Sequence, residues 1–301
     1  MSELDPAPAS AATATPEVPE RVARPRVLTV VLAVIAATLL TVFVATAVLM
    51  LLATRSGVSL LDPAALTTFS SSPAVVQWLL VAQSGVLLCV ALVVALCSPE
   101  RAAPRLGLVR PAGARGESFT VARLAAVMIA TTVATWSVNC CVMSLALLGS
   151  GGERSTLLTA IDDAIRQSEG SDFLVVALGV ALLASVSEEL FFRGVVQRRL
   201  SARFGPILGV GVASSLFALA HFDWMHSSAA LAMGLAMGVG AHRSRSTWTG
   251  VLAHVTNNAA VVLITRLAVP SPAALSSHAI AAGVYCVLAI GAVAVLVRAT
   301  R

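Results

Sequence analysis

Residues 187–194 read Ser-Glu-Glu-Leu-Phe-Phe-Arg-Gly and place two adjacent carboxylates and an arginine inside an apolar run that begins near Phe173. A charged side chain near the centre of a bilayer costs at least about 2.5 kcal/mol on insertion scales. Glu189 and Arg193 lie four residues apart, so in a helix they share a face and can neutralise each other. Glu188 lies about 100° further round and has no such local partner. The stretch therefore predicts a functional site within the membrane, in which Glu189 is structural and Glu188 is available for chemistry.

The composition around this stretch is that of a membrane protein. Of the 301 residues, 57% are hydrophobic and 12% are charged, whereas soluble proteins have about 25% charged residues. The net charge of +5 comes from 20 basic residues, all of them arginine. These lie in the connections between apolar runs and not in a patch with interleaved aromatics, so they indicate membrane topology and no nucleic-acid partner.

Eight apolar runs predict an all-α, polytopic transmembrane helical bundle of about eight spans. The runs are 27–54, 73–97, 119–148, 173–197, 206–222, 229–241, 248–264 and 279–297. Most arginines fall in alternate connections, namely the tail, 98–118, 198–205, 242–247 and the C-terminus. The positive-inside rule places these segments together in the cytoplasm. We therefore expect a multi-pass protein of the plasma membrane with both termini cytoplasmic.

Three regions divide the chain. Residues 1–26 are rich in Ala, Pro, Glu and Thr and are expected to form a disordered cytoplasmic tail. Residues 27–97 hold two N-terminal spans, and 98–301 form a membrane domain whose motif-bearing core is about 172–265. A short amphipathic helix is predicted near 157–165, in the polar connection before the fourth span.

Two further polar pairs lie in later spans. His221 follows Phe217 by four residues, and Asn258 follows His254 by four, so each pair shares a helix face. A helical rise of about 1.5 Å per residue puts Glu188 and both histidines about 13–22 Å in from the predicted cytoplasmic ends of their spans. All three can therefore meet in one cavity. A carboxylate there can act as a base toward water, while imidazoles and an amide can bind a divalent metal or polarise a carbonyl.

In this order and on separate spans, Glu-Glu-x-x-x-Arg, Phe-x-x-x-His and His-x-x-x-Asn resemble the three motifs of the CAAX-protease and bacteriocin-processing (CPBP) family of intramembrane metalloproteases, which includes the Ras-converting CAAX endopeptidase. The resemblance covers about residues 105–265, so 98–301 is interpreted as a CAAX-protease-like domain. It implies an integral-membrane endopeptidase of CAAX-processing type. Its site would open to the cytosol and would act on a peptide or membrane-protein substrate.

The resemblance also implies roles for individual residues. Glu188 and His221 would activate water, and His254 and Asn258 would stabilise the oxyanion or take part in metal binding. With the Glu189–Arg193 pair, these residues complete the predicted catalytic set. A divalent metal such as zinc would be held by Glu188, His221 and His254. Because the chain lacks a His-Glu-x-x-His helix, such ligands would have to come from several spans.

Other readings of the same residues stay open at this point. Glu188, Glu189 and Arg193 could form a buried ion-pair network that fixes helix register. A bundle with central Glu, Arg and His could be a proton-coupled transporter, although the two halves show no inverted repeat. The chain could also be a non-catalytic scaffold or a bacteriocin-immunity factor, although Glu188, His221 and His254 are all intact.

Overall fold

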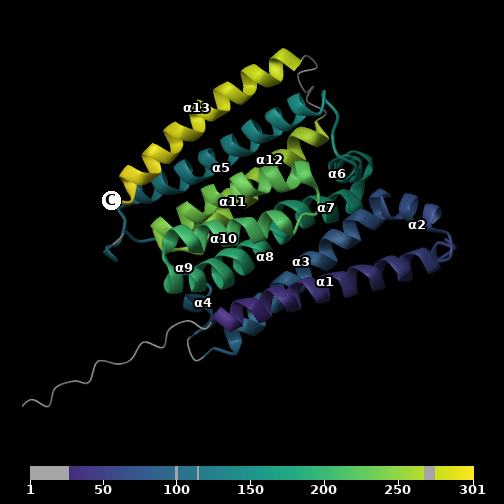
Figure 1. Ribbon diagram of the computed structural model, residues 1–301, viewed down its shortest axis with the longest axis horizontal. Helices are drawn as coiled ribbons and strands as arrows, with labels where there is room; N and C mark the ends of the chain where they lie inside the picture. The colour runs from purple at the N-terminus through teal and green to yellow at the C-terminus, as the bar shows by residue number, and fades with distance from the viewer. Residues whose placement is uncertain (1–26, 99–100, 114, 268–274) are drawn as a thin grey trace, which may run out of the picture.

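The computed structural model describes residues 27–98, 101–113, 115–267 and 275–301, and most of these residues are helical. The predicted tail 1–26 lies outside the described residues. All eight apolar runs form helices, which confirms the all-α fold (Figure 1).

The helices fall into three groups. Four long ones flank the bundle: α1 (Val27–Arg55), α3 (Pro73–Leu96), α5 (Val121–Gly149) and α13 (Leu275–Ala299). The inner helices are α10 (Pro206–Leu219), α11 (Trp224–Ser244), α12 (Thr247–Arg266) and one interrupted helix made of α7 (Gly170–Leu178), η1 (Gly179–Ala184), α8 (Ser185–Glu189), η2 (Leu190–Gln197) and α9 (Arg198–Phe204). Short helices α2 (Pro63–Ser70), α4 (Ala102–Arg105) and α6 (Thr156–Gln167) lie between them.

The inner helices occupy the middle of the bundle. Helices α5 and α13 pack together on one side, with α5 against α11 and α12, while α1 and α3 cover the interrupted helix from the other side (Figure 1). The close approach of α11 depends on small residues: a Cβ at Gly234 would touch Ser214 and Phe217, and one at Gly238 would touch Gln197. Small residues at the spacing of Gly234 and Gly238 therefore allow α11 to pack closely against its neighbours.

The number of helices suited to cross a membrane differs from the eight predicted spans. In the described part of the chain, five helices are long and apolar enough, namely α1, α3, α5, the interrupted helix and α13. Helix α10 has only 14 residues, and α11 and α12 are long enough but less apolar. The reason is their interior position: 11 of 21 residues in α11 are buried, against four of 29 in α1. The crossing of the membrane by all eight runs stays a prediction.

The amphipathic helix predicted near 157–165 is present as α6. Ser155 caps it by accepting a hydrogen bond from the Leu158 amide over 3.4 Å. Its apolar face buries Ala164 and Ile165, while Asp162 forms an ion pair with Arg154 at 3.3 Å. The helix thus lies on the ends of α3 and α12 as a cover for one end of the bundle.

The connections predicted to be cytoplasmic gather at the opposite end. The hydroxyl of Thr247 donates to the Leu106 carbonyl over 2.7 Å, and the hydroxyl of Ser246 donates to the Val109 carbonyl over 2.6 Å. Arg198 in α9 donates to the Pro104 carbonyl, at the end of α4, over 3.4 Å. The segment before α5, the end of the interrupted helix and the α11–α12 turn therefore share one end of the bundle.

Candidate active site

The helix that carries both carboxylates is not a regular α-helix. Two π-helical segments, η1 and η2, flank α8, and α8 ends with Glu188 and Glu189. A π turn closes its hydrogen bonds one residue further along than an α turn, and such turns occur often at functional sites. Hydrophobic periodicity did not predict them, because a single wide turn leaves little trace in an almost wholly apolar run.

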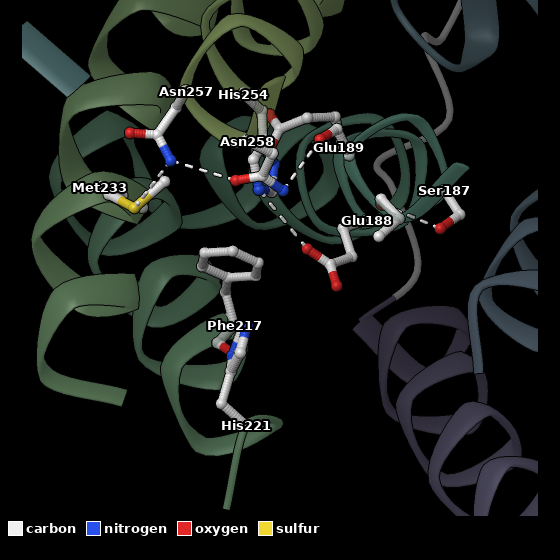
Figure 2. A network of polar contacts seen from close by, with 12 residues as sticks. Ser187, Glu188, Glu189, Phe217, His221, Met233, His254, Asn257 and Asn258 are labelled. Carbon is white, nitrogen blue, oxygen red and sulfur yellow. Dashed lines mark hydrogen bonds and ion pairs between the residues drawn. The ribbon is translucent and has the colours of Figure 1, made fainter. Parts of the chain in front are cut away.

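Glu189 lies at the centre of a buried charged group. Its side chain is 0% exposed, and its Oε1 lies 3.1 Å from Arg193 Nη1. The same oxygen lies 3.2 Å from His254 Nδ1 (Figure 2). Arg193 also donates to the Gly234 carbonyl over 3.3 Å, and its guanidinium lies 4.7 Å from the centre of the Phe217 ring. The predicted Glu189–Arg193 pair is therefore confirmed. The second partner of Glu189 is His254. The sequence placed this histidine in the same cavity but did not predict its contact with Glu189.

Glu188 is held differently from its neighbour. Its Oε2 lies 3.7 Å from His254 Nε2, which is beyond hydrogen-bond distance, and the residue is 8% exposed (Figure 2). The absence of an ion-pair partner on its own helix is as predicted, and the imidazole within 4 Å of it, that of His254, comes from α12. Of the two carboxylates, Glu188 is therefore the less tightly held.

His254 connects the two carboxylates through the two sides of its ring. A carboxylate only accepts hydrogen bonds, so the contact with Glu189 places a proton on Nδ1 of His254. Its Nε2 then faces Glu188 and is the nitrogen that gains or loses a proton when the ring changes charge. A proton can therefore be transferred between α12 and α8 at one place, between Nε2 of His254 and the carboxylate of Glu188.

His221 lies on the other side of Phe217 from His254. The ring centres of Phe217 and His221 are 4.9 Å apart, and those of Phe217 and His254 are 5.8 Å apart. Nδ1 of His221 lies 2.8 Å from the Phe217 carbonyl, so the neutral ring carries its proton there and presents Nε2 as an acceptor. His226, to which the sequence assigned no role, lies with its ring centre 4.2 Å from that of His221. It was missed because it starts a different helix and forms no spaced pair.

Asn258 ties α12 to the wide turn before the carboxylates. Its Nδ2 donates to the Val180 carbonyl over 3.2 Å and to Ser185 Oγ over 3.1 Å. Its Oδ1 accepts from Asn257 over 3.1 Å, and Asn257 in turn accepts from Asn139 over 3.3 Å. The Nδ2 group of Asn258 thus uses both of its protons to hold η1 and α8 against α12. Its predicted oxyanion role stays a prediction, and it would require one of these bonds to be exchanged.

The predicted metal ligands do not form a complete set as they stand. Among the residues that the structure describes, no group of three or more His, Cys, Asp or Glu side chains is close enough to hold a metal ion. Glu188 and His254 could supply two ligands, but His221 is across the Phe217 ring.

A bundle with several membrane-length helices and a buried glutamate–histidine site defines the class of multi-pass membrane proteins with an internal polar site. Residues 170–260 match the family model described as type II CAAX prenyl endopeptidase, Rce1-like. The match includes the catalytic set predicted from the sequence, namely Glu188, Glu189, Arg193, His221, His254 and Asn258. Searches of curated proteins and of solved structures returned no match. Over these residues, which are about a third of the chain, the sequence is similar to the CAAX-protease family, in agreement with the resemblance of its motifs.

Proposed function

We propose that the protein is an intramembrane endopeptidase of the CAAX-processing type, which hydrolyses a bond in a peptide or membrane-protein substrate. One observation carries the proposal: of two adjacent carboxylates in a single buried site, Glu189 is engaged by Arg193 and His254, while Glu188 has no hydrogen-bonded partner on its own helix. A pure register-fixing network would gain nothing from the second acid, because burying a charge without a strong partner costs free energy.

In this proposal Glu188 acts as the general base. It takes a proton from a water molecule, the water oxygen bonds to the carbonyl carbon of the scissile peptide, and the carbonyl π electrons move onto oxygen. The intermediate then breaks its C–N bond, and the proton held by Glu188 passes to the leaving amine. His254, held by Glu189, would stabilise the oxyanion through Nε2–H when its ring carries both protons.

The remaining residues of the predicted set support this step. His221 presents an unprotonated Nε2 and would orient the water or carry the proton to the amine. Asn258 and Ser185 fix the turn that aims Glu188. Access from the cytosolic side, cytoplasmic termini and a location in the plasma membrane belong to the same proposal. A divalent metal such as zinc stays a prediction.

The test is cleavage of a fluorogenic peptide set by the purified full-length protein. Glu188→Gln should abolish cleavage without loss of folding, whereas Asp172→Asn, which removes an exposed acid from the same helix, should leave it unchanged. His221→Ala should lower cleavage, with His242→Ala, an exposed histidine, as its control. Full cleavage by a folded Glu188→Gln protein would exclude the proposed base.

A further inference from the structure

A polar residue of α5 lies outside residues 170–260, which match the family model, yet it is connected to the helix that carries the site. Asn139 shares a helix face with Thr131 and Thr135, because the three residues follow one another at intervals of four. The two threonine hydroxyls donate to carbonyls of α5 itself, over 2.9 and 2.8 Å. Asn139 instead donates from Nδ2 to Oδ1 of Asn257, over 3.3 Å. It therefore connects α5 to α12, whereas the threonines bond within α5.

Asn257 passes this contact on to its neighbour in the sequence. Its Nδ2 donates to Oδ1 of Asn258 over 3.1 Å, and the same nitrogen lies 3.9 Å from Sδ of Met233 in α11 (Figure 2). Adjacent side chains of a helix point about 100° apart. One side chain of the pair therefore faces α5 and α11, while the other faces η1 and α8. The two amides thus connect two sides of α12.

The three amides form a chain in which every donor points the same way. Nδ2 of Asn139 donates to Asn257, and Nδ2 of Asn257 donates to Asn258. Nδ2 of Asn258 then donates to Oγ of Ser185 over 3.1 Å. An amide that turned by 180° would exchange its oxygen and its NH2 group, and would break the chain on both sides. Because hydrogen bonds in a chain also polarise one another, the donor of Asn139 helps to fix the orientation of the two amides that follow.

The chain ends one helical turn away from the proposed base. Ser185 is 0% exposed and precedes Glu188 by three residues, where η1 meets α8. Glu188 lies 3.7 Å from His254 without a hydrogen bond, so the position of its carboxylate depends on the backbone of α8. A general base has to be held within about 0.5 Å of its productive position. The contacts that hold α8 therefore bear directly on the reaction.

We propose that Asn139 is a positioning residue, which acts through the amides of α12 to hold α8 where Glu188 can reach its water. This inference rests on the proposed function, because it assigns Asn139 to the same reaction. Without the donor of Asn139, the Oδ1 atom of Asn257, a residue that is 3% exposed, is left unpaired. The amide of Asn257 is then free to turn, and the hold on Ser185 weakens. A hydrogen bond that only joined two helices would contribute to stability and leave turnover by the folded protein unchanged.

The first test compares kcat and KM of the purified full-length protein for a peptide that it cleaves. Asn139→Leu keeps nearly the shape of asparagine but has no donor. It should lower kcat about 5- to 10-fold, the factor that corresponds to the net value of one hydrogen bond, and leave KM unchanged. Asn139→Gln, which keeps an amide, should recover part of the loss. Thr135→Val is the matched control, because it removes a bond within α5 only and should leave kcat unchanged. An unchanged kcat for folded Asn139→Leu, or a change in KM alone, would overturn the proposal.

A double variant tests the route by which Asn139 acts. Asn139→Leu combined with Asn258→Ala should have the same kcat as Asn258→Ala alone, because the effect of Asn139 passes through Asn258. Losses of kcat that multiply in the double variant would show that Asn139 acts by another route, and the assignment would be wrong.

Hydrogen–deuterium exchange of the backbone amides over residues 179–189 gives a readout that does not require cleavage. In one detergent, Asn139→Leu should raise the exchange rate there severalfold and leave that of α1 unchanged, while Thr135→Val should alter neither. Asn139→Ala is measured in parallel, so that the test does not depend on the folding of the leucine variant. If the wild-type protein cleaves no peptide, the proposed function fails, while raised exchange would still support the hold on α8. Unchanged exchange would overturn the inference whether or not the protein is a peptidase.

Discussion

Glu189→Gln should destabilise the protein much more than Glu188→Gln, although the two side chains are adjacent. Glu189 is 0% exposed and lies 3.1 Å from Arg193, which is itself 1% exposed. Removing one partner of a buried ion pair leaves the other charge uncompensated and costs about 3–5 kcal/mol. Glu188 lies 3.7 Å from His254 without a hydrogen bond, so its amide variant should lose about 1 kcal/mol or less.

The difference is measurable by thermal unfolding in one detergent, followed by the fluorescence of the four tryptophans. A change of 1 kcal/mol shifts Tm by about 2–4 °C in a domain of 150–250 residues. Glu189→Gln should therefore lower Tm by about 6–20 °C, and Glu188→Gln by about 4 °C or less. Cleavage is then compared well below both midpoints, where Glu188→Gln should be folded and inactive.

A double-mutant cycle separates the ion pair from other losses. Glu189→Gln with Arg193→Gln removes both charges, so it should be less destabilised than the sum of the single variants by about 1–3 kcal/mol. Additive losses would mean that the two side chains do not stabilise each other. Equal, fold-preserving loss of cleavage in the Glu188 and Glu189 variants would refute the division into a structural and a chemical carboxylate.

Two other changes test the packing around the site, and a third tests the burial of Asp162 in α6. Gly250→Ala places a methyl group against the Glu189 carboxylate and should cost about 1–3 kcal/mol, whereas Gly291→Ala, which meets open space, should not lower Tm. Asn258→Ala should cost about 1–3 kcal/mol by leaving buried partners unpaired and should lower the cleavage rate, both measured on the same preparation. Burial raises the pKa of Asp162 in α6 above its usual 3.8, so the folded state binds the proton more tightly and stability falls as pH rises from the usual pKa through the raised one. Asp162→Asn should lose this part of the dependence of Tm on pH, and an unchanged slope would contradict the assignment.

The sequence was sufficient for the helices and for the main pairing in the site. Apolar length and the i,i+4 spacing of Glu189 and Arg193 are local signals, and both the helices and that contact are present. Contacts between side chains on different helices were harder to predict from the sequence. His254 contacts both carboxylates because of where α12 lies, and Asn258 meets Ser185 across 73 positions of sequence. No spacing rule encodes such contacts.

Composition alone does not set the number of spans, which stays a prediction. Helices α11 and α12 read as apolar runs, yet they are interior helices in which small and polar residues contact other helices and not lipid. A residue that faces protein need not be strongly hydrophobic. A mixture of apolar, small and polar residues is therefore compatible both with a membrane span and with a helix enclosed by other spans. Only the packing of the helix distinguishes the two.

The π-helical segments η1 and η2 lie on either side of α8. The direction in which the two carboxylates point therefore depends on the number of residues in these segments. Each π turn holds one residue more than an α turn of similar span. Deleting one residue from η1 would restore an α turn and rotate the helix that precedes α8 by about 100° relative to Glu188. Deleting one from η2 would instead turn Arg193 away from Glu189. This helix should therefore accept many changes of side chain in η1 but hardly any change in length, so natural variation within it should consist of substitutions and not of gaps.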